Sequence, residues 1–423
     1  MLFLNTQLHL LFFKIINLFD DLVEICFGVS MFHVSLETLP YFTKESGREL
    51  LKEGKENITL RGLKILLEDV NKFKEFSATG KYLLLRFIGE NLNQRQRSIH
   101  LMEYLPEVQE TNFKRPVFIL SLPRTGSTFF HCSLLKDKRW NSPTSWEFHQ
   151  PLPHVYPLPS EYVKKVRSFN KSLRSMEIRL GESFTRSHHV EATSPEDIGE
   201  ILIGEGIWCY MAEAFNLPNY MDYIKNLPKK DFAQSYNIIK KRIRLMCRYQ
   251  NMENRRFLLM LHLGLNTNIE ALLETFPDAQ FIMLHRNLTE IIPSATSLYS
   301  YLQLDYKKQN LDNKQFICDG ITERYVEELE KMKSWRNSEK FQDCNFKRII
   351  DIKFTDLIKD PIQVFKSLYK DLEMEYTPEC NESFLKHFEE QNKIKRVKHV
   401  YQKVNVDKKL LERSKDYHHQ YVY

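Results

Sequence analysis

The sequence has 423 residues, a length that suits one large α/β domain with insertions or two domains. Hydrophobic residues make up 42% and charged residues 27%, which excludes a disordered chain, and the net charge of +6 is too mild and dispersed to indicate nucleic-acid binding. Seven scattered cysteines with no CxxC pair argue against a disulfide scaffold or a zinc site. We therefore expect a cytoplasmic protein with reduced thiols and no metal.

The first 30 residues predict an amphipathic helix. Its apolar positions share one helical face: Leu8, Leu11, Phe12, Ile15, Phe19, Leu22, Val23 and Cys26. No run reaches the ~20 apolar residues that a membrane-spanning helix needs, and no basic stretch precedes the apolar run as in a signal peptide. We expect this face to pack on the protein's own body. Peripheral membrane contact through residues 1–30, or a dimer helix, is the alternative.

The rest of the chain alternates predicted helices and strands. Residues 1–110 read as a helical N-terminal region, the proline-rich stretch 140–160 as irregular, and 160–250 as a helical insertion. Four short apolar runs have the length and β-branched content of buried strands: 117–120, 257–261, 281–284 and 348–352. Helices are expected at 127–135, 269–276, from about 289 and at 361–372. This order predicts an α/β fold with a parallel sheet, whose ligands lie beyond the carboxyl ends of the strands.

The loop Leu122–Thr128 lies between a predicted strand and a predicted helix. Gly126 lets the backbone approach an anion closely, and the free N–H groups at the start of the helix attract negative charge. Ser127 and Thr128 add hydroxyl donors, and Arg124 adds a forked cation for phosphate or sulfate oxygens. The loop is therefore a candidate phosphate site, although an ordinary strand–helix turn could carry the same pattern. The Walker A pattern is absent, which disfavours an ATPase or GTPase.

A second anion site is predicted after the strand 281–284. Arg286 follows this strand directly, and Ser294 lies eight residues further along the expected helix. Both side chains could reach one phosphate group. Two separate anion sites at neighbouring strand ends indicate a ligand that carries phosphates at both of its ends.

The two loops together resemble those of the sulfotransferases that use 3′-phosphoadenosine 5′-phosphosulfate (PAPS), in particular the broad carbohydrate- and small-molecule-type group. Pro123–Thr128 matches the P-R-[ST]-G-[ST]-T loop of that group, and Phe276–Ala279 with His285-Arg286 and Pro293-Ser294 is similar to its 3′-phosphate segment. Further similar features are Trp146-Glu147, His188 before Pro195-Glu196-Asp197, Asp356-Leu357 with Asp360-Pro361, and Lys398–Tyr401. The resemblance spans roughly residues 110–410.

The resemblance implies specific roles. It implies a P-loop-like three-layer α/β core in a sulfotransferase domain at 111–423, which needs no metal. The 5′-phosphosulfate of PAPS would be held by Arg124, Thr125, Gly126, Ser127 and Thr128, and the 3′-phosphate by Arg286 and Ser294. The reaction would move a sulfuryl group to a hydroxyl or amine of a small-molecule or carbohydrate acceptor and release adenosine 3′,5′-bisphosphate. Neither the acceptor nor the oligomeric state can be read from the sequence.

Three residues compete as the general base that takes the acceptor proton. Glu147 resembles the acidic base of related enzymes, His188 could titrate near neutral pH, and His262 follows a predicted strand. Each could equally be a hydrogen-bonded structural residue.

One departure from the family pattern bears on activity. The family Lys that contacts the transferring group is missing near Leu261, so either Arg255 or Arg256 substitutes or turnover is impaired. A catalytically impaired nucleotide-binding relative is therefore the main alternative to an active enzyme, and another phosphate-loop enzyme of the kinase type is a more remote one.

Overall fold

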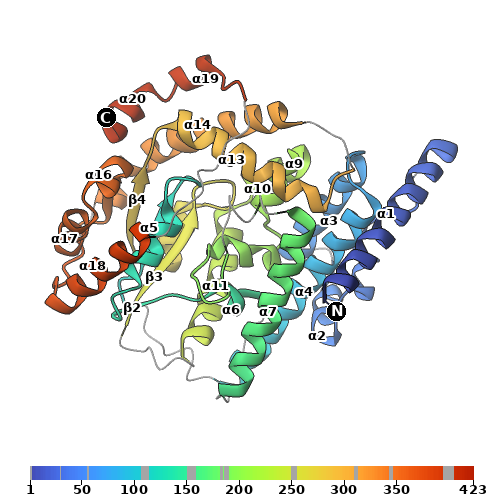
Figure 1. Ribbon diagram of the computed structural model, residues 1–423, viewed down its shortest axis with the longest axis horizontal. Helices are drawn as coiled ribbons and strands as arrows, with labels where there is room; N and C mark the ends of the chain where they lie inside the picture. Colours follow the sequence, from blue (N-terminus) through green and yellow to red (C-terminus); the bar gives the residue numbers. More distant parts are fainter. Residues whose placement is uncertain are drawn as a thin grey trace.

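The fold is built on one parallel sheet (Figure 1). The computed structural model describes residues 2–28, 30–54, 57–105, 114–149, 159–181, 184, 190–248, 255–308, 313–342, 346–393 and 404–423. Five strands pair in the order β2-β3-β1-β4-β5, all in parallel. Their bounds are β1 Val117–Ser121, β2 Trp140–Asn141, β3 Arg256–His262, β4 Gln280–His285 and β5 Ile349–Lys353. Because the strands are parallel, all their carboxyl ends meet at one edge of the sheet.

Helices cover both faces of the sheet. Successive side chains of a strand point to opposite faces, so Phe118 joins one buried cluster while its neighbour Val117 joins another. The Val117 cluster contains Phe130 of α5 (Ser127–Leu134), Phe365 of α17 (Pro361–Asp371) and Phe384 of α18 (Pro378–Lys393). Figure 1 shows α17 and α18 on one side of the sheet and α11 (Lys229–Arg248) and α13 (Leu288–Leu302) on the other. The predicted three-layer α/β fold is confirmed.

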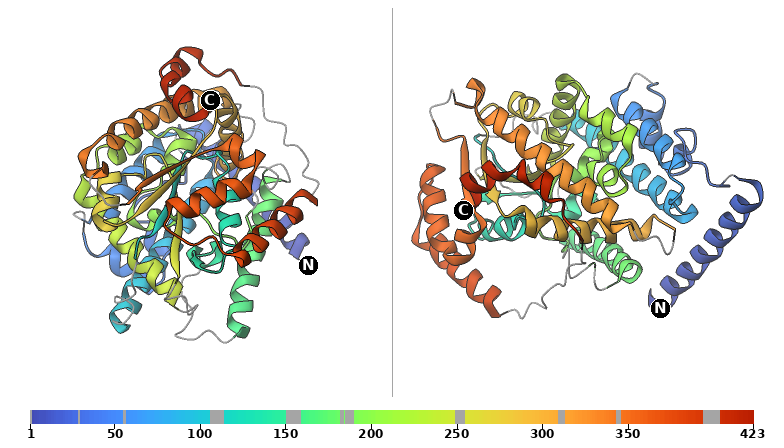
Figure 2. Two further views of the ribbon diagram at one scale, coloured as in Figure 1. Left: turned by 90° about the vertical axis from the view of Figure 1, so that its left-hand side faces the viewer. Right: turned by 90° about the horizontal axis from the view of Figure 1, so that it is seen from above.

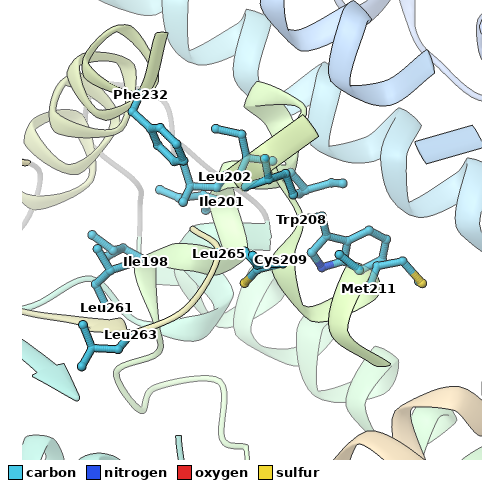
Figure 3. Packing of buried hydrophobic residues seen from close by; sticks show 14 of the residues in the cluster. Ile198, Ile201, Leu202, Trp208, Cys209, Met211, Phe232, Leu261, Leu263 and Leu265 are labelled. Carbon is cyan, nitrogen blue, oxygen red and sulfur yellow. The ribbon is translucent and has the colours of Figure 1, made fainter. Parts of the chain in front are cut away.

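The Phe118 cluster extends into the N-terminal region and the insertion. It includes apolar residues of α3 (Ile58–Lys72), α4 (Ala78–Tyr104), the 3₁₀ helix η3 (Ile198–Glu205) and α9 (Cys209–Phe215). In Figure 3, η3 residues such as Ile201 and Leu202 pack beside Phe232 of α11 (Lys229–Arg248). The N-terminal helices therefore share one hydrophobic core with the sheet, and they can form a wall of a site at its edge.

The remaining helices include the largely buried α13 and α14 as well as short connections and surface elements. They are η1 Leu39–Tyr41, α2 Glu45–Leu51, α6 Ser145–His149, α7 Pro159–Leu180, α10 Pro218–Lys225, α12 Ile269–Thr275, α13 Leu288–Leu302, η4 Gln303–Asp305, α14 Lys314–Arg336, α15 Glu339–Gln342, α16 Phe354–Lys359, α19 Lys408–Glu412, α20 Lys415–Tyr417 and η5 His418–Val422. The four predicted strands agree with the structure to within one or two residues.

The prediction of an irregular stretch at 140–160 is wrong in part. The stretch contains the short strand β2 and the helix α6. Thr144 precedes α6, and the amide and hydroxyl of Thr144 both donate to the Glu147 carboxylate at 2.7 Å. The bond from the Thr144 amide to the Glu147 side chain is the Glu half of a capping box, and α6 begins at the next residue, Ser145. Residues 150–158 lie outside the described part of the chain.

The first helix reverses the expected orientation. In α1 (Leu2–Phe27) the apolar side chains of the described residues face outward, with Leu18 63% and Ile25 80% exposed. The polar side of α1 contacts the body instead, and Asp20 is buried. The expectation that the apolar face packs on the protein was therefore wrong. Among the described helices, none combines the length and the apolar character needed to cross a membrane.

Candidate functional site

The first loop has the backbone shape of an anion site. It leaves the end of β1, and Gly126 then adopts φ 93°, in the left-handed region, directly before α5. A Cβ atom at Gly126 would lie 2.9 Å from the ring of Phe354, so a side chain is excluded here by space as well as by conformation. The amide groups that begin α5 are therefore open to an approaching anion.

The second loop directly contacts the first. The Nε of Arg124 donates to the hydroxyl of Ser294 at 2.9 Å. The second loop also donates to the first, since Nη1 of Arg286 donates to the carbonyl oxygen of Arg124 at 3.3 Å. The guanidinium of Arg286 lies 4.1 Å from the ring centroid of Phe354, the same ring that faces Gly126. Four residues expected in two separate anion sites thus form one contiguous cluster.

The other predicted residues of the first loop have different surroundings. Thr128 is exposed and lines the same cavity as Arg124. The side chain of Thr125 is buried and turned inward, where its hydroxyl donates to the carbonyl of Leu122 at 2.9 Å. Thr125 therefore holds the loop in shape, and only its backbone is available to a ligand.

His262 lies at the carboxyl end of β3, opposite Ser121 of β1. Its Nδ1 is 2.7 Å from a carboxylate oxygen of Asp197, and its Nε2 is 3.0 Å from the hydroxyl of Ser127. Tyr210 also donates to the Asp197 carboxylate. Burial by itself would raise the pKa of Asp197, but His262 and the hydroxyl of Tyr210 hold that pKa below its usual value. Asp197 is thus an anion that fixes the orientation of the imidazole.

Of the other two base candidates, one is placed by the structure and one is not. Glu147 is 5% exposed and is engaged in the capping box with Thr144. Among the described residues, those that line the cavity include Ser145 and His149 but not Glu147. His188 lies outside the described residues, so its role stays a prediction. Of the two candidates that the structure describes, it brings His262 and not Glu147 to the phosphate loop.

The capping role of Glu147 can be tested with Glu147→Gln. Glutamine also satisfies a capping box, so we expect the variant to keep its melting temperature and its transfer rate to within a few-fold. Glu147→Ala removes the cap and is expected to cost about 0.5–2 kcal/mol of stability. Thermal unfolding and a transfer assay measure both effects. A hundredfold loss of rate in a normally folded Glu147→Gln would instead make Glu147 the base.

Neither proposed substitute for the family Lys reaches the site. Arg256 is the first residue of β3 and His262 is the last, so the two lie at opposite ends of the same strand. Leu261 is fully buried. The guanidinium of Arg256 donates to the carbonyl oxygens of Arg115 at 2.5 Å and Leu372 at 3.1 Å. Arg255 precedes it in the chain and is equally remote. The suggestion that either residue replaces the Lys was wrong, because strand direction separates them from the loops.

The two loops border one cavity of about 1570 Å³. Arg124, Ser127, Arg286 and His262 line one part of this cavity, and we call the remaining part the chamber. Many aromatic and aliphatic side chains line the chamber, among them Tyr82, Phe87, Phe169, Leu173, Trp208, Met211, Phe215, Leu298, Leu302 and Tyr306, together with charged side chains such as Arg86, Glu90, Arg97 and Arg179. Pockets for small ligands usually measure about 300–1,000 Å³, so this cavity has room for a nucleotide and a second molecule.

Two further carboxyl groups line the cavity beside His262 and have shifted pKa values. Burial raises the pKa of Glu196 to about 7 and that of Glu200 to about 8. Both groups therefore hold a proton in the folded protein at pH values where an unfolded chain has released it. Glu196 and Glu200 can donate hydrogen bonds into the cavity below these values.

These shifts predict a fall in stability as the pH rises. Between about 4.5 and 8 the folded state binds more protons at Glu200 than the unfolded state, so the free energy of unfolding decreases across that window. Glu200→Gln removes this dependence, and we expect its gain in melting temperature over wild type to be larger at pH 8.5 than at pH 5. The exposed Glu389→Gln is the control and should show no such trend. A constant difference at both pH values would contradict the raised pKa.

Three residues of the site were not predicted as functional from the sequence: Asp197, Tyr210 and Phe354. Phe354 could have been found, because it follows the predicted strand 348–352 and the ends of parallel strands share one edge. Asp197 and Tyr210 belong to the helical insertion, and only the tertiary fold brings them to β3.

Comparisons with known proteins agree with this geometry. A family model described as "Sulfotransferase family" matches residues 116–378, more than half of the chain. The chain is 26% identical over 271 residues to the omega-hydroxy-beta-dihydromenaquinone-9 sulfotransferase Stf3 of Mycobacterium bovis and of Mycobacterium tuberculosis. The match covers 61% of this chain and 62% of each relative, so the chain spans less than two thirds of the relatives' length.

Solved structures show the same fold. The sulfotransferase STF1 of Mycobacterium tuberculosis H37Rv superposes with a TM-score of 0.70 and 20% identity, over 84% of this chain and 94% of that one. The sulfotransferase STF9 of Mycobacterium avium superposes with a TM-score of 0.66 and 18% identity, over 96% of each chain. With the family match across the sheet and both of its loops, the chain belongs to the sulfotransferase family.

Proposed function

We propose that this protein transfers a sulfuryl group from PAPS to a hydroxyl group of a largely apolar acceptor. The observation that carries the proposal is the direct contact between the two loops, in which Arg124 bonds to Ser294 and Arg286 bonds to the backbone of Arg124. A ligand with anionic groups at both ends can engage both guanidinium groups from one position in the cavity. The absence of a Walker A pattern disfavours a nucleoside triphosphate as that ligand.

The donor would be held by groups that the sequence singled out. The backbone of Thr125 and Gly126, with Arg124, Ser127 and Thr128, would hold the 5′-phosphosulfate, while Arg286 and Ser294 would hold the 3′-phosphate. When bound, the donor supplies an activated sulfuryl group on its 5′-phosphate. The ring of Phe354, between Gly126 and Arg286, offers a flat surface for the nucleoside.

His262 is the proposed general base. With its proton on Nδ1 and donated to Asp197, the imidazole would have its Nε2 lone pair facing the phosphate loop, where it would accept from the Ser127 hydroxyl. A donor that engages Ser127 would free this lone pair for the acceptor. Nε2 then takes the hydroxyl proton as the acceptor oxygen bonds to sulfur, and Arg124 stabilises the charge that develops on the departing phosphate.

The lining of the chamber supports an apolar acceptor. In the lining, Trp208 stacks on Phe87 with 4.7 Å between their ring centroids. Phe215, also in the lining, stacks on Phe76 with 4.2 Å between the centroids. The similar Stf3 proteins are named for an acceptor with a hydroxyl on a menaquinone, which is also largely apolar. The N-terminal helical region at 1–110 would form part of the acceptor wall, and the sulfotransferase domain at 111–423 would hold the donor.

The missing family Lys supports a second possibility, a relative that binds the nucleotide without turnover. Transfer of labelled sulfate from PAPS separates the two. The acceptor panel should pair long-chain primary alcohols with monosaccharides, and we expect transfer to the alcohols. Tight nucleotide binding with no transfer to any acceptor would favour the inactive relative, and transfer to the sugars alone would contradict the proposed acceptor class.

A further inference from the structure

The N-terminal helix α1 is attached to the protein through its polar side. The carboxylate of Asp20 accepts from the hydroxyl of Ser30 at 2.9 Å and from the amide of Met31 at 2.7 Å. One turn earlier, Asn17 accepts from the amide of Thr79 at 2.9 Å. These polar contacts fix which side of the helix faces the body and leave the opposite side turned away from it.

The opposite side is a continuous apolar stripe. Its members recur at helical spacing and are each more than half exposed: Leu11, Phe12, Ile15, Leu18, Phe19, Leu22 and Ile25. Single exposed apolar residues are normal on a protein surface, but a continuous stripe of this size marks an interaction site. In the view from above, α1 forms an arm along the edge of the molecule (Figure 2, right).

Aromatic contacts connect this helix with the wall of the acceptor chamber. The ring of Phe13 lies 6.3 Å from that of Tyr82, which in turn lies 5.7 Å from the ring of Phe42. Tyr82 and Phe42 both line the cavity. The apolar stripe therefore belongs to a helix that packs directly on residues of the chamber.

A basic helix packs against α1. Helix α7 contacts α1 and carries exposed basic side chains at Lys164, Arg167, Lys171 and Arg174. Lys14 of α1 itself is also exposed. Basic residues beside an apolar helix face favour a surface that is apolar inside and anionic outside.

We propose that the apolar stripe of α1 docks on an anionic lipid bilayer, with α7 against the headgroups. A second copy of the chain could cover the stripe, but it would bring a second set of basic side chains toward the first, which costs electrostatic energy. A bilayer with anionic lipids would bury the apolar stripe and would also attract the basic side chains to its headgroups. Docking would hold the chamber next to the phase in which an apolar acceptor dissolves, a consequence that rests on the proposed function.

Co-sedimentation of the full chain with vesicles tests the docking. Wild type is expected to bind mixed phosphatidylcholine–phosphatidylglycerol vesicles and to bind pure phosphatidylcholine more weakly. Leu18→Glu with Ile25→Glu should reduce the partition coefficient at least about tenfold, since each change removes an apolar side chain from the interface. Lys164→Glu with Lys171→Glu should reduce binding to the mixed vesicles by about fivefold or more per charge. The matched control is Phe316→Glu, an exposed apolar position on α14 that should bind like wild type.

The proposal would be overturned if wild type did not bind mixed vesicles, or if the Leu18/Ile25 variant bound them as well as wild type. It would also be overturned if sedimentation velocity without vesicles showed a wild-type dimer that this variant converts to a monomer. Both changed side chains are exposed, and an unchanged melting temperature shows that the variant is folded. The vesicle assay contains no donor, and titration of the same variant with adenosine 3′,5′-bisphosphate reports on the nucleotide site. Failure of docking and failure of the proposed function are therefore read separately.

Discussion

Arg124→Ala is expected to weaken binding of adenosine 3′,5′-bisphosphate by roughly 10- to 150-fold, or about 1.5–3 kcal/mol, the scale of a hydrogen bond to a charged group. Arg124 lines the cavity and joins the two loops through Ser294. Replacing Arg124 removes one cation that would contact the ligand and also removes the hydrogen bond between the two loops. Isothermal titration calorimetry measures the effect, and a normal melting temperature excludes unfolding.

Two further variants define the cause of that loss. Arg124→Lys keeps the positive charge but loses the paired N–H donors of the guanidinium, so it is expected to recover only part of the affinity. Arg413→Ala removes a surface guanidinium that pairs with Glu330, and it should bind like wild type. Full affinity in Arg124→Ala would mean that the anion lies elsewhere, and the proposed donor site would have to be abandoned.

His262→Ala is expected to lower kcat by about 10²–10⁴-fold while the affinity for the bisphosphate changes by only a few-fold. The imidazole lies between the Asp197 carboxylate and the phosphate loop, so its removal takes away the proposed proton acceptor but not the cations that hold the donor. Single-turnover transfer from labelled PAPS measures the chemical step directly. A rate close to that of wild type would transfer the role to His188 or another group.

Asp197→Asn separates positioning from chemistry. Asparagine keeps the shape of the side chain but removes the negative charge beside the imidazole, so kcat is expected to fall while the affinity for the bisphosphate changes by only a few-fold. A purely structural role would lower the melting temperature and the nucleotide affinity together with the rate. Glu147→Gln is the contrasting variant, with a rate expected to stay within a few-fold of that of wild type.

The three central strands of the sheet were predictable because they are buried on both faces. Continuous apolar runs such as 281–284 identify such strands without any knowledge of the tertiary fold. β2 could not be found in this way, because it has only two residues, Trp140 and Asn141, and pairs with β3 alone. The capping box at Thr144 and Glu147 was visible in the sequence, but Glu147 was interpreted as a base from family resemblance.

The site was predictable where chain order fixes position. Arg124 and Arg286 each follow a strand, and parallel strands carry both residues to one edge of the sheet. Asp197 comes from the insertion and reaches His262 only through tertiary packing, which no local pattern encodes. In α1, periodicity identified the apolar face but could not tell what covers it. Buried polar contacts such as Asp20 with Met31 decide the orientation.

The most direct test of the account is a calorimetric comparison of adenosine 3′,5′-bisphosphate with ADP on the wild-type chain. If Arg124 and Arg286 hold opposite ends of one nucleotide, the 3′,5′-bisphosphate should bind at least about tenfold more tightly, and Arg286→Ala should abolish that preference. Equal affinity for the two nucleotides, or an Arg286→Ala variant that keeps the full preference, would contradict it.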